Sequence, residues 1–166
     1  MSRGFVNEDD QEEIPLVPPR ADLPQGVTNY VTQVGMDELL QEKEDLLSEI
    51  ENLDPSNEKE KRIATNHIHA KLQLLNNRIS SAKIIDLSQQ PKDEIRFGAL
   101  VSLLEEGQKK PQRYQIVGVD EANISKGKIS FISPLARILI NKKVGEKAIL
   151  NLADRNRIFE IKEIKY

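Results

Sequence analysis

Cysteine and tryptophan are both absent from the 166 residues, and aromatic residues make up only 4% of the chain. The lack of cysteine excludes disulfides, thiolate metal sites and a cysteine nucleophile. The scarcity of aromatics argues against a large aromatic-lined ligand pocket. No apolar run approaches the roughly 20 residues that cross a bilayer, and the acidic start, MSRGFVNEDDQEEIP, is unlike a signal peptide. We therefore expect a cytoplasmic protein without a membrane contact.

An excess of positive charge is also missing. The formal net charge is −3, so the chain has no general attraction to nucleic-acid phosphate. Hydrophobic residues make up 38% and charged residues 31%, which indicates a modest core combined with extended, solvated helix. If the protein acts near DNA or RNA, we expect another protein to bring it there.

Residues 1–34 read as an extended, acidic and proline-rich arm. NEDDQEE is an acidic cluster, and IPLVPPRADLP holds four of the eight prolines. Proline fixes φ and donates no backbone hydrogen bond, so this stretch should be extended, with polyproline II character. Two interpretations stay open. The arm is either a disordered tail, or Ile14, Leu16 and Val17 dock on a neighbouring surface.

Residues 35–85 predict an antiparallel coiled-coil hairpin. In the first helix, residues 36–53, a heptad seam is formed by Leu39, Leu46, Ile50 and Leu53, with Lys43 at the missing seam position. Asp54 is expected to cap the second helix, residues 55–83, with Pro55 in its first turn. The apolar stripe of that helix comprises Ala64, Ile68, Leu75, Ile79 and Ala82, with Leu72 beside it.

Residues 86–94 contain Pro91 and read as a linker, after which the apolar period changes to two. Residues 95–166 then predict five short strands and one helical insert, SPLARILIN, with Ser133 as cap and Pro134 in the first turn. Strands joined mostly by short turns favour an antiparallel sheet with one helix packed on it. The expected fold class is α+β: a helical hairpin followed by an antiparallel β-sheet domain with one short helix.

No self-contained active site is visible in the sequence. His67 and His69 are two positions apart on a helix, so they point in different directions and do not form a metal pair. No nucleophile elbow, P-loop or dinucleotide motif is present. What remains is an acidic hairpin tip around Glu49, Glu51 and Asp54. Carboxylates suit Mg²⁺, but a solvated turn and a helix cap are the simpler explanation of these residues.

One segment carries a specific resemblance. YQIVGVDEANISKGKISFISPLARILINKKVGE, residues 114–146, resembles the carboxy-terminal domain of the GreA/GreB family of bacterial transcription elongation factors, through YQIVGVDEA, GKIS, SPLAR and KKVGE in that order. AKIIDLS, residues 82–88, is similar to the end of that family's second coiled-coil helix. YVTQVGMDELLQE, residues 30–42, is similar to the start of its first helix.

The resemblance implies an FKBP-like domain, residues 95–166, that binds the β′ rim of the secondary channel of bacterial RNA polymerase. It implies a coiled coil that enters the channel, where Glu51 and Asp54 would help to hold Mg²⁺ at the polymerase active centre and so promote cleavage of backtracked RNA. The chain would be a monomer without a tightly bound cofactor or an enzymatic activity of its own, and would meet DNA and the RNA 3′ end through the polymerase. The positions that match the docking surface are Asp120, Glu121, Ala122, Ser133, Pro134, Leu135 and Ala136.

The tip departs from the family pattern. GDLSENAEY is replaced by IENLDPSNEKEKR, and a first helix of 18 residues spans only about 27 Å. The second helix is not shortened to match, so we expect the arm to run alongside it. Three functions stay open: a transcript-cleavage factor, a secondary-channel regulator without cleavage activity, and an adaptor that binds some protein other than polymerase.

Overall fold

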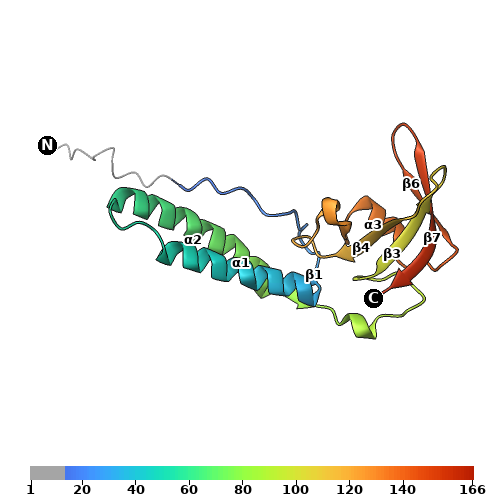
Figure 1. The fold of residues 1–166 in the computed structure, drawn as a ribbon, viewed down its shortest axis with the longest axis horizontal. Coiled ribbons are helices and arrows are strands. Elements are labelled where there is room, and N and C mark those ends of the chain that lie inside the picture. The colour runs from blue at the N-terminus through green and yellow to red at the C-terminus, as the bar shows by residue number, and fades with distance from the viewer. Residues whose placement is uncertain (1–13) are drawn as a thin grey trace.

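The computed structural model describes residues 14–166, in which a helical hairpin and a β-sheet domain lie end to end (Figure 1). The acidic NEDDQEE segment lies outside the described residues. None of the helices within residues 14–166 combines the length and the apolar character needed to cross a lipid bilayer. The arrangement is α+β, as the sequence predicted.

The hairpin consists of α1 (Gln33–Glu51) and α2 (Glu58–Ser81). α1 begins three residues before the predicted start because Thr32 caps it: the Thr32 hydroxyl accepts a hydrogen bond from the Gly35 N–H at 2.9 Å. Threonine at this position satisfies a backbone donor that has no partner inside the helix.

The seam between the two helices follows the predicted heptads. Its buried residues are Leu39, Leu46, Ile68, Leu72 and Leu75, with Met36, Ile50, Leu53 and Ile79 packed around them. Leu72, placed beside the stripe from the sequence, lies inside the seam. Lys43, at the missing seam position, remains half-buried.

The predicted start of the second helix is wrong. α2 begins at Glu58 and is capped by Asn57, whose side chain accepts a hydrogen bond from the Glu60 N–H at 3.2 Å. Asp54 instead accepts from the Ser56 N–H at 2.9 Å, two residues on. This local side-chain to backbone bond forms a turn that competes with helix at this position, so Pro55 lies in the connection and not in the helix.

The domain is built on a sheet with the order β5-β4-β3-β7-β6. Its five strands match the five predicted, and they are β3 (Leu100–Glu105), β4 (Gln112–Val117), β5 (Lys128–Ser130), β6 (Lys147–Asn151) and β7 (Asn156–Lys165). The expectation of a purely antiparallel sheet is wrong, because β5 pairs with β4 in parallel. The chain between them crosses through a 3₁₀ turn, η3 (Ile124–Lys126), so β5 enters the sheet in the same direction as β4.

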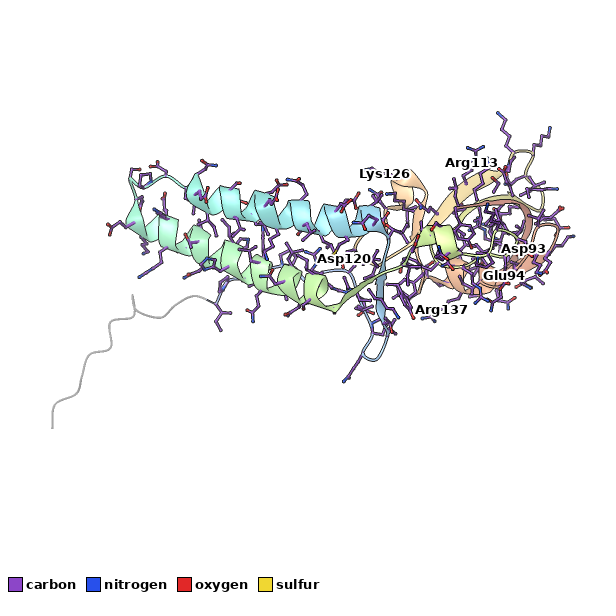
Figure 2. All side chains as sticks on the ribbon, turned by 90° about the horizontal axis from the view of Figure 1, so that it is seen from below. Asp93, Glu94, Arg113, Asp120, Lys126 and Arg137 are labelled. Atoms are coloured by element: carbon purple, nitrogen blue, oxygen red, sulfur yellow. The ribbon has the colours of Figure 1, made fainter. Side chains whose placement is uncertain are left out.

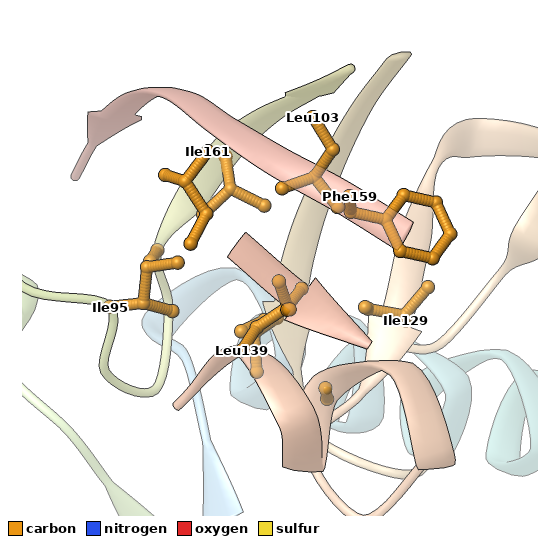
Figure 3. Packing of buried hydrophobic residues seen from close by; sticks show 11 residues of the cluster. Ile95, Leu103, Ile129, Leu139, Phe159 and Ile161 are labelled. Carbon is orange, nitrogen blue, oxygen red and sulfur yellow. The ribbon is translucent and has the colours of Figure 1, made fainter. Parts of the chain in front are cut away.

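The core of the domain lies between one face of the sheet and helix α3 (Pro134–Leu139), as Figure 3 shows. Ser133 caps α3 as predicted, accepting from the Ala136 N–H at 3.3 Å. The buried residues of this core are Ile95, Ala99, Val101, Leu103, Ile116, Ile129, Ala136, Leu139, Ala148, Phe159 and Ile161. Such a core is independent of the hairpin seam, so each part has its own hydrophobic stabilisation.

Residues 14–28 form an extended arm that ends in β1 (Asn29–Val31), which pairs in parallel with β2 (Ala82–Ile84). In Figure 1 the arm runs beside the hairpin, as expected from the unequal helix lengths. Ile14 and Leu16 are 91% and 93% exposed, so neither docks on the rest of the chain, and their docking on a partner stays a prediction. Val17 is partly buried and lines a cavity of about 410 Å³ between the arm, the hairpin and the domain.

Candidate functional site

The base of the hairpin is joined to the domain by an aromatic cluster. Tyr30 of β1 packs against Phe97 and Phe131, with ring centroids 5.6 to 5.9 Å apart. Gly118 lies directly against the same strand, since a Cβ at this position would come 2.6 Å from the Tyr30 carbonyl oxygen. Because β1 leads straight into α1, this packing fixes the point at which the hairpin leaves the domain.

Glu121 makes a second contact at the same joint. Its side chain is only 3% exposed, accepts a hydrogen bond from the Thr32 hydroxyl, and forms an ion pair with Lys128 at 3.1 Å. Thr32 is the residue that caps α1, so Glu121 ties the start of the hairpin to the β4–β5 connection. A buried carboxylate is stable only when its oxygens are paired in this way.

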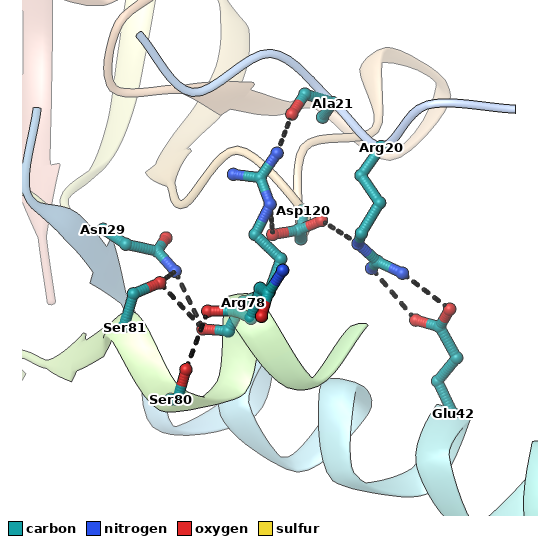
Figure 4. A network of polar contacts seen from close by, with 9 residues as sticks. Arg20, Ala21, Asn29, Glu42, Arg78, Ser80, Ser81 and Asp120 are labelled. Atoms are coloured by element: carbon teal, nitrogen blue, oxygen red, sulfur yellow. Dashed lines mark hydrogen bonds and ion pairs between the residues drawn. The ribbon is translucent and has the colours of Figure 1, made fainter. Parts of the chain in front are cut away.

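Asp120 joins three parts of the chain (Figure 4). One of its carboxylate oxygens accepts from the Arg20 Nε at 2.9 Å, and the other lies 3.6 Å from the Arg78 Nε. Arg20 also forms two hydrogen bonds with Glu42 of α1, at 2.8 and 3.1 Å. These bonds with Glu42 raise the pKa of the Arg20 guanidinium above its ordinary value. Arg78 in turn donates to the Ala21 carbonyl.

The residues that match the family's docking surface therefore differ in how far the structure exposes them. Asp120 and Glu121 point inward at the joint between hairpin and domain, where Figure 2 places Asp120. Ala136 is buried in the domain core and Leu135 is partly buried, whereas Ala122 and Pro134 face solvent. Of the seven assigned residues, Ala122 and Pro134 are exposed and Ser133 and Leu135 are partly exposed, so a partner can contact these four without a structural change.

The hairpin tip carries the other assigned pair. Glu51 is the last residue of α1, and Asp54 follows in the connection; both are exposed. The hydrogen bond from the Ser56 N–H holds the pKa of Asp54 below its usual value, so this carboxylate is ionised at neutral pH. No group of three or more potential metal ligands occurs within residues 14–166. Two tip carboxylates can hold a hydrated Mg²⁺ only weakly, so further ligands would have to come from a partner.

His67 and His69 lie on α2 as expected, one half-buried and the other exposed. Their spacing of two residues places them on different sides of the helix, and they belong to no cluster of potential metal ligands in the described residues. They take no part in the arrangement at the joint or at the tip.

The sequence reasoning missed Arg20, Glu42 and Arg78 as functional candidates. One signal for Arg20 was available: it is the only lysine or arginine between Gly4 and Glu42. A lone cation in such a segment is a candidate for an ion pair with a carboxylate elsewhere in the chain. The identity of that partner could not be read from the sequence, because Asp120 is 100 positions away.

The comparison with protein families identifies the domain. The family description "Transcription elongation factor, GreA/GreB, C-term" matches residues 90–166. Residues 90–166 of this chain therefore resemble the carboxy-terminal domain of the GreA/GreB family. Among curated proteins, the chain is 37% identical over 99 residues to the transcription elongation factor GreA of Maricaulis maris (strain MCS10), covering 60% of this chain and 63% of that protein. It is 37% identical over 103 residues to GreA of Sinorhizobium medicae (strain WSM419), covering 62% and 65%. The chain thus matches a little under two thirds of the length of these GreA relatives.

Solved structures that match the chain include the GreA factor homolog 1 (Gfh1) protein of Thermus thermophilus. That structure is 22% identical, with a TM-score of 0.40, and the match covers 84% of this chain and 100% of that one. The elongation factor GreA/GreB of Nitrosomonas europaea is 16% identical, with a TM-score of 0.42 over 82% and 98% of the two chains.

Proposed function

We propose that this protein is a transcription elongation factor that binds bacterial RNA polymerase and stimulates the cleavage of backtracked RNA. The observation that supports the proposal is the combination of a domain that matches the GreA/GreB family with a hairpin that is joined to it by ion pairs and ends in exposed carboxylates. The domain would dock at the rim of the polymerase secondary channel. The hairpin would then enter the channel with its tip foremost.

Glu51 and Asp54 would act at the active centre of the polymerase. Both carboxylates are exposed and can supply oxygen ligands to Mg²⁺, provided that the polymerase supplies the others. Bound there, Mg²⁺ stabilises charge on the oxygens of a phosphodiester during hydrolysis. The contribution of this chain would be to carry two exposed carboxylates to that place, so the protein would have no catalytic activity without the polymerase.

A second function is favoured by the length of the hairpin. α1 has 19 residues and spans about 28 Å, close to the length predicted from the sequence. A finger of this length could bind in the channel and alter pausing or initiation without bringing the tip to the active centre. Asp54 is also engaged in a hydrogen bond with the Ser56 N–H, which uses part of its capacity to accept another partner.

The test is an assay of RNA length on a stalled, backtracked polymerase complex, with binding measured in parallel. The cleavage function predicts shortened RNA with the wild-type protein, and the loss of that effect with unchanged affinity when Glu51→Ala and Asp54→Ala are combined. Glu38→Ala with Glu44→Ala is a matched control, because it removes two exposed carboxylates of α1 away from the tip. Binding with altered pausing and unchanged RNA length would support the second function.

Docking is tested separately. Pro134→Arg places a large charged side chain on the exposed part of the assigned surface, at a position that, unlike Ala122, does not line the cavity around Arg20 and Asp120. We expect this variant to reduce the affinity for polymerase at least tenfold. A wild-type protein with no measurable affinity for polymerase at micromolar concentration would contradict both functions and favour the adaptor interpretation.

A further inference from the structure

Among the described residues, Arg20 is the only residue of the arm whose side chain forms ion pairs with both the hairpin and the domain. Its guanidinium lies between Glu42 of α1 and Asp120 of the β4–β5 connection (Figure 4). We propose that Arg20 is a positioning residue, and that residues 17–31, which we call the strap, fix the direction in which the hairpin projects from the domain.

Two sets of contacts hold the hairpin at different points along its length. At its base, the hairpin is held by the contact between Thr32 and Glu121 and by the pairing of β1 with β2. A helix held at one end can still pivot about that end. Glu42 is nine residues after the start of α1 at Gln33, roughly 14 Å further along the helix axis. The ion pairs of Arg20 therefore add a second fixed point, and two points define a direction.

The strap itself is anchored at both of its ends. Before β1, Arg20 is paired as described, and Arg78 of α2 donates to the Ala21 carbonyl. At β1, the Asn29 side chain donates to the Arg78 carbonyl at 3.1 Å and to the Ser81 hydroxyl at 3.2 Å. A segment tied to α1, α2 and the domain at once can transmit force between them, whereas a loosely attached tail cannot.

Burial makes the Arg20–Asp120 pair stronger than an ordinary surface pair, whereas the Glu42 side chain is 43% exposed and is held by its two hydrogen bonds with Arg20. The side chain of Arg20 is 19% exposed and that of Asp120 is 7% exposed. Exposed pairs contribute little because water and salt screen them. A partly buried arginine that pairs two carboxylates through its rigid, planar group also fixes their relative geometry. Removing the guanidinium would leave Asp120 with the longer contact to Arg78 as its remaining ion pair in the described chain.

The consequence would be largest at the tip. For a helix of about 28 Å, a pivot of roughly 10° at the base displaces the far end by about 5 Å. Catalytic geometry is sensitive to displacements of about 1 Å, which can cost about 100-fold in rate. Affinity that depends on the domain would change much less. This part of the inference rests on the proposed function, whereas the fixed direction of the hairpin does not.

The absence of cysteine makes a direct test possible. The variants Lys59→Cys, at the start of α2, and Lys147→Cys, on β6, would carry the only two thiols, and both positions are exposed. Spin labels at these positions report the distribution of distances between the tip and the domain in the isolated protein. We expect a single narrow distribution, which Arg20→Ala should broaden by several ångströms while the circular dichroism spectrum stays unchanged.

Matched variants distinguish the loss of the strap's contacts from a general loss of folded structure. Glu42→Gln should broaden the distribution in the same way, and the double variant should broaden it no further, because both changes break the same contact. Arg20→Lys should give an intermediate width, since lysine keeps the charge but loses the two-pronged geometry. Arg155→Ala removes an exposed arginine that forms no ion pair among the described residues, and should leave the distribution unchanged. A folded Arg20→Ala protein with the wild-type distribution would overturn the proposal.

The effect of Arg20 on RNA cleavage is tested by a separate measurement. With polymerase, Arg20→Ala should lower the effect of the protein on RNA cleavage about 10- to 100-fold and change the affinity less than about threefold. A broadened distribution with unchanged cleavage would contradict the positioning role of Arg20. If the wild-type protein does not bind polymerase at all, the proposed function fails, while the distance measurement still decides whether the strap fixes the hairpin.

Discussion

Gly35 of α1 and Glu121 of the β4–β5 connection are packed so closely that a Cβ at position 35 would lie 2.6 Å from the Glu121 Oε1. Glu121 cannot move aside freely, because Thr32 and Lys128 hold its two carboxylate oxygens. The glycine therefore leaves room for a buried carboxylate at the point where the hairpin joins the domain. Its role is spatial, since it lies within a regular helix.

Gly35→Ala should therefore destabilise the protein, although alanine is the better helix former. Alanine within a helix is favoured over glycine by about 1 kcal/mol. Displacing Glu121 from its partners would cost more, because breaking a buried ion pair costs about 3–5 kcal/mol. We expect the free energy of unfolding, measured by urea denaturation, to fall by about 2 kcal/mol. Ser48→Ala, on an exposed position of the same helix, should leave stability unchanged or slightly raised. A Gly35→Ala protein that is as stable as wild type would show that Glu121 moves without loss.

Acid should weaken the pairing of β3 with β7. Arg157 forms two hydrogen bonds of 2.7 Å with Glu105, and these bonds hold the pKa of Glu105 below its ordinary value of 4.5. Since the folded state favours the ionised carboxylate, the unfolded state binds the proton first as the pH falls. The stabilisation is therefore complete above about pH 5 and is lost as the pH falls through the lowered pKa of the folded state.

Glu105→Gln should remove this part of the pH dependence. We expect a loss of about 1 kcal/mol in the free energy of unfolding at pH 7 and a flatter stability curve between about pH 5 and pH 3. Arg157→Gln should produce the same change, and combining the two should add little, because they disrupt one contact. The measurement is urea denaturation across this pH range. A curve for Glu105→Gln that keeps the wild-type slope would rule out this carboxylate as a source of the acid sensitivity.

The hairpin could be predicted from the sequence because its information is local. A heptad repeat of leucines and isoleucines defines the seam wherever the rest of the chain lies. The start of α2 was missed because two side chains, Asp54 and Asn57, compete as caps, and the deciding hydrogen bond of Asp54 goes to Ser56. Propensity alone does not rank such alternatives.

The joint could not be predicted, because its information is not local. Asp120 pairs with a residue 100 positions earlier, and Glu121 with one 89 positions earlier. Both carboxylates belong to the segment with the strongest family resemblance, which suggested a surface exposed to polymerase. Their burial follows from the arm and the hairpin base packing against that segment. The parallel pairing of β5 was missed for a similar reason, since period-two alternation is the same in parallel and antiparallel strands.

The two adjacent leucines of α2 allow a controlled test of the seam. Leu75 is fully buried and Leu74 is 36% exposed. Leu75→Ala should lower the free energy of unfolding of the hairpin by about 3 kcal/mol, because it leaves a cavity in the seam. Leu74→Ala should lower it by less than about 1 kcal/mol. Hydrogen exchange locates the effect: amides of α1 and α2 should exchange faster in Leu75→Ala, while those of β3 and β7 keep their rates. Equal effects of the two substitutions would contradict the seam as described.

The reach of the hairpin is the variable that separates the two proposed functions. Inserting one heptad into α1 after Glu44, and a matching heptad into α2 before Ile68, would lengthen the finger by about 10 Å and keep the seam in register. If reach limits cleavage, the longer protein should cleave backtracked RNA at least tenfold faster than wild type with similar affinity for polymerase. Adding Glu51→Ala and Asp54→Ala to the longer protein should abolish the gain, because the tip carboxylates would be the groups delivered. An insertion of four residues in each helix displaces the seam and serves as the control for length without register. A longer protein that binds polymerase but cleaves no faster than wild type would show that the chemistry of the tip, and not the length of the finger, sets the activity.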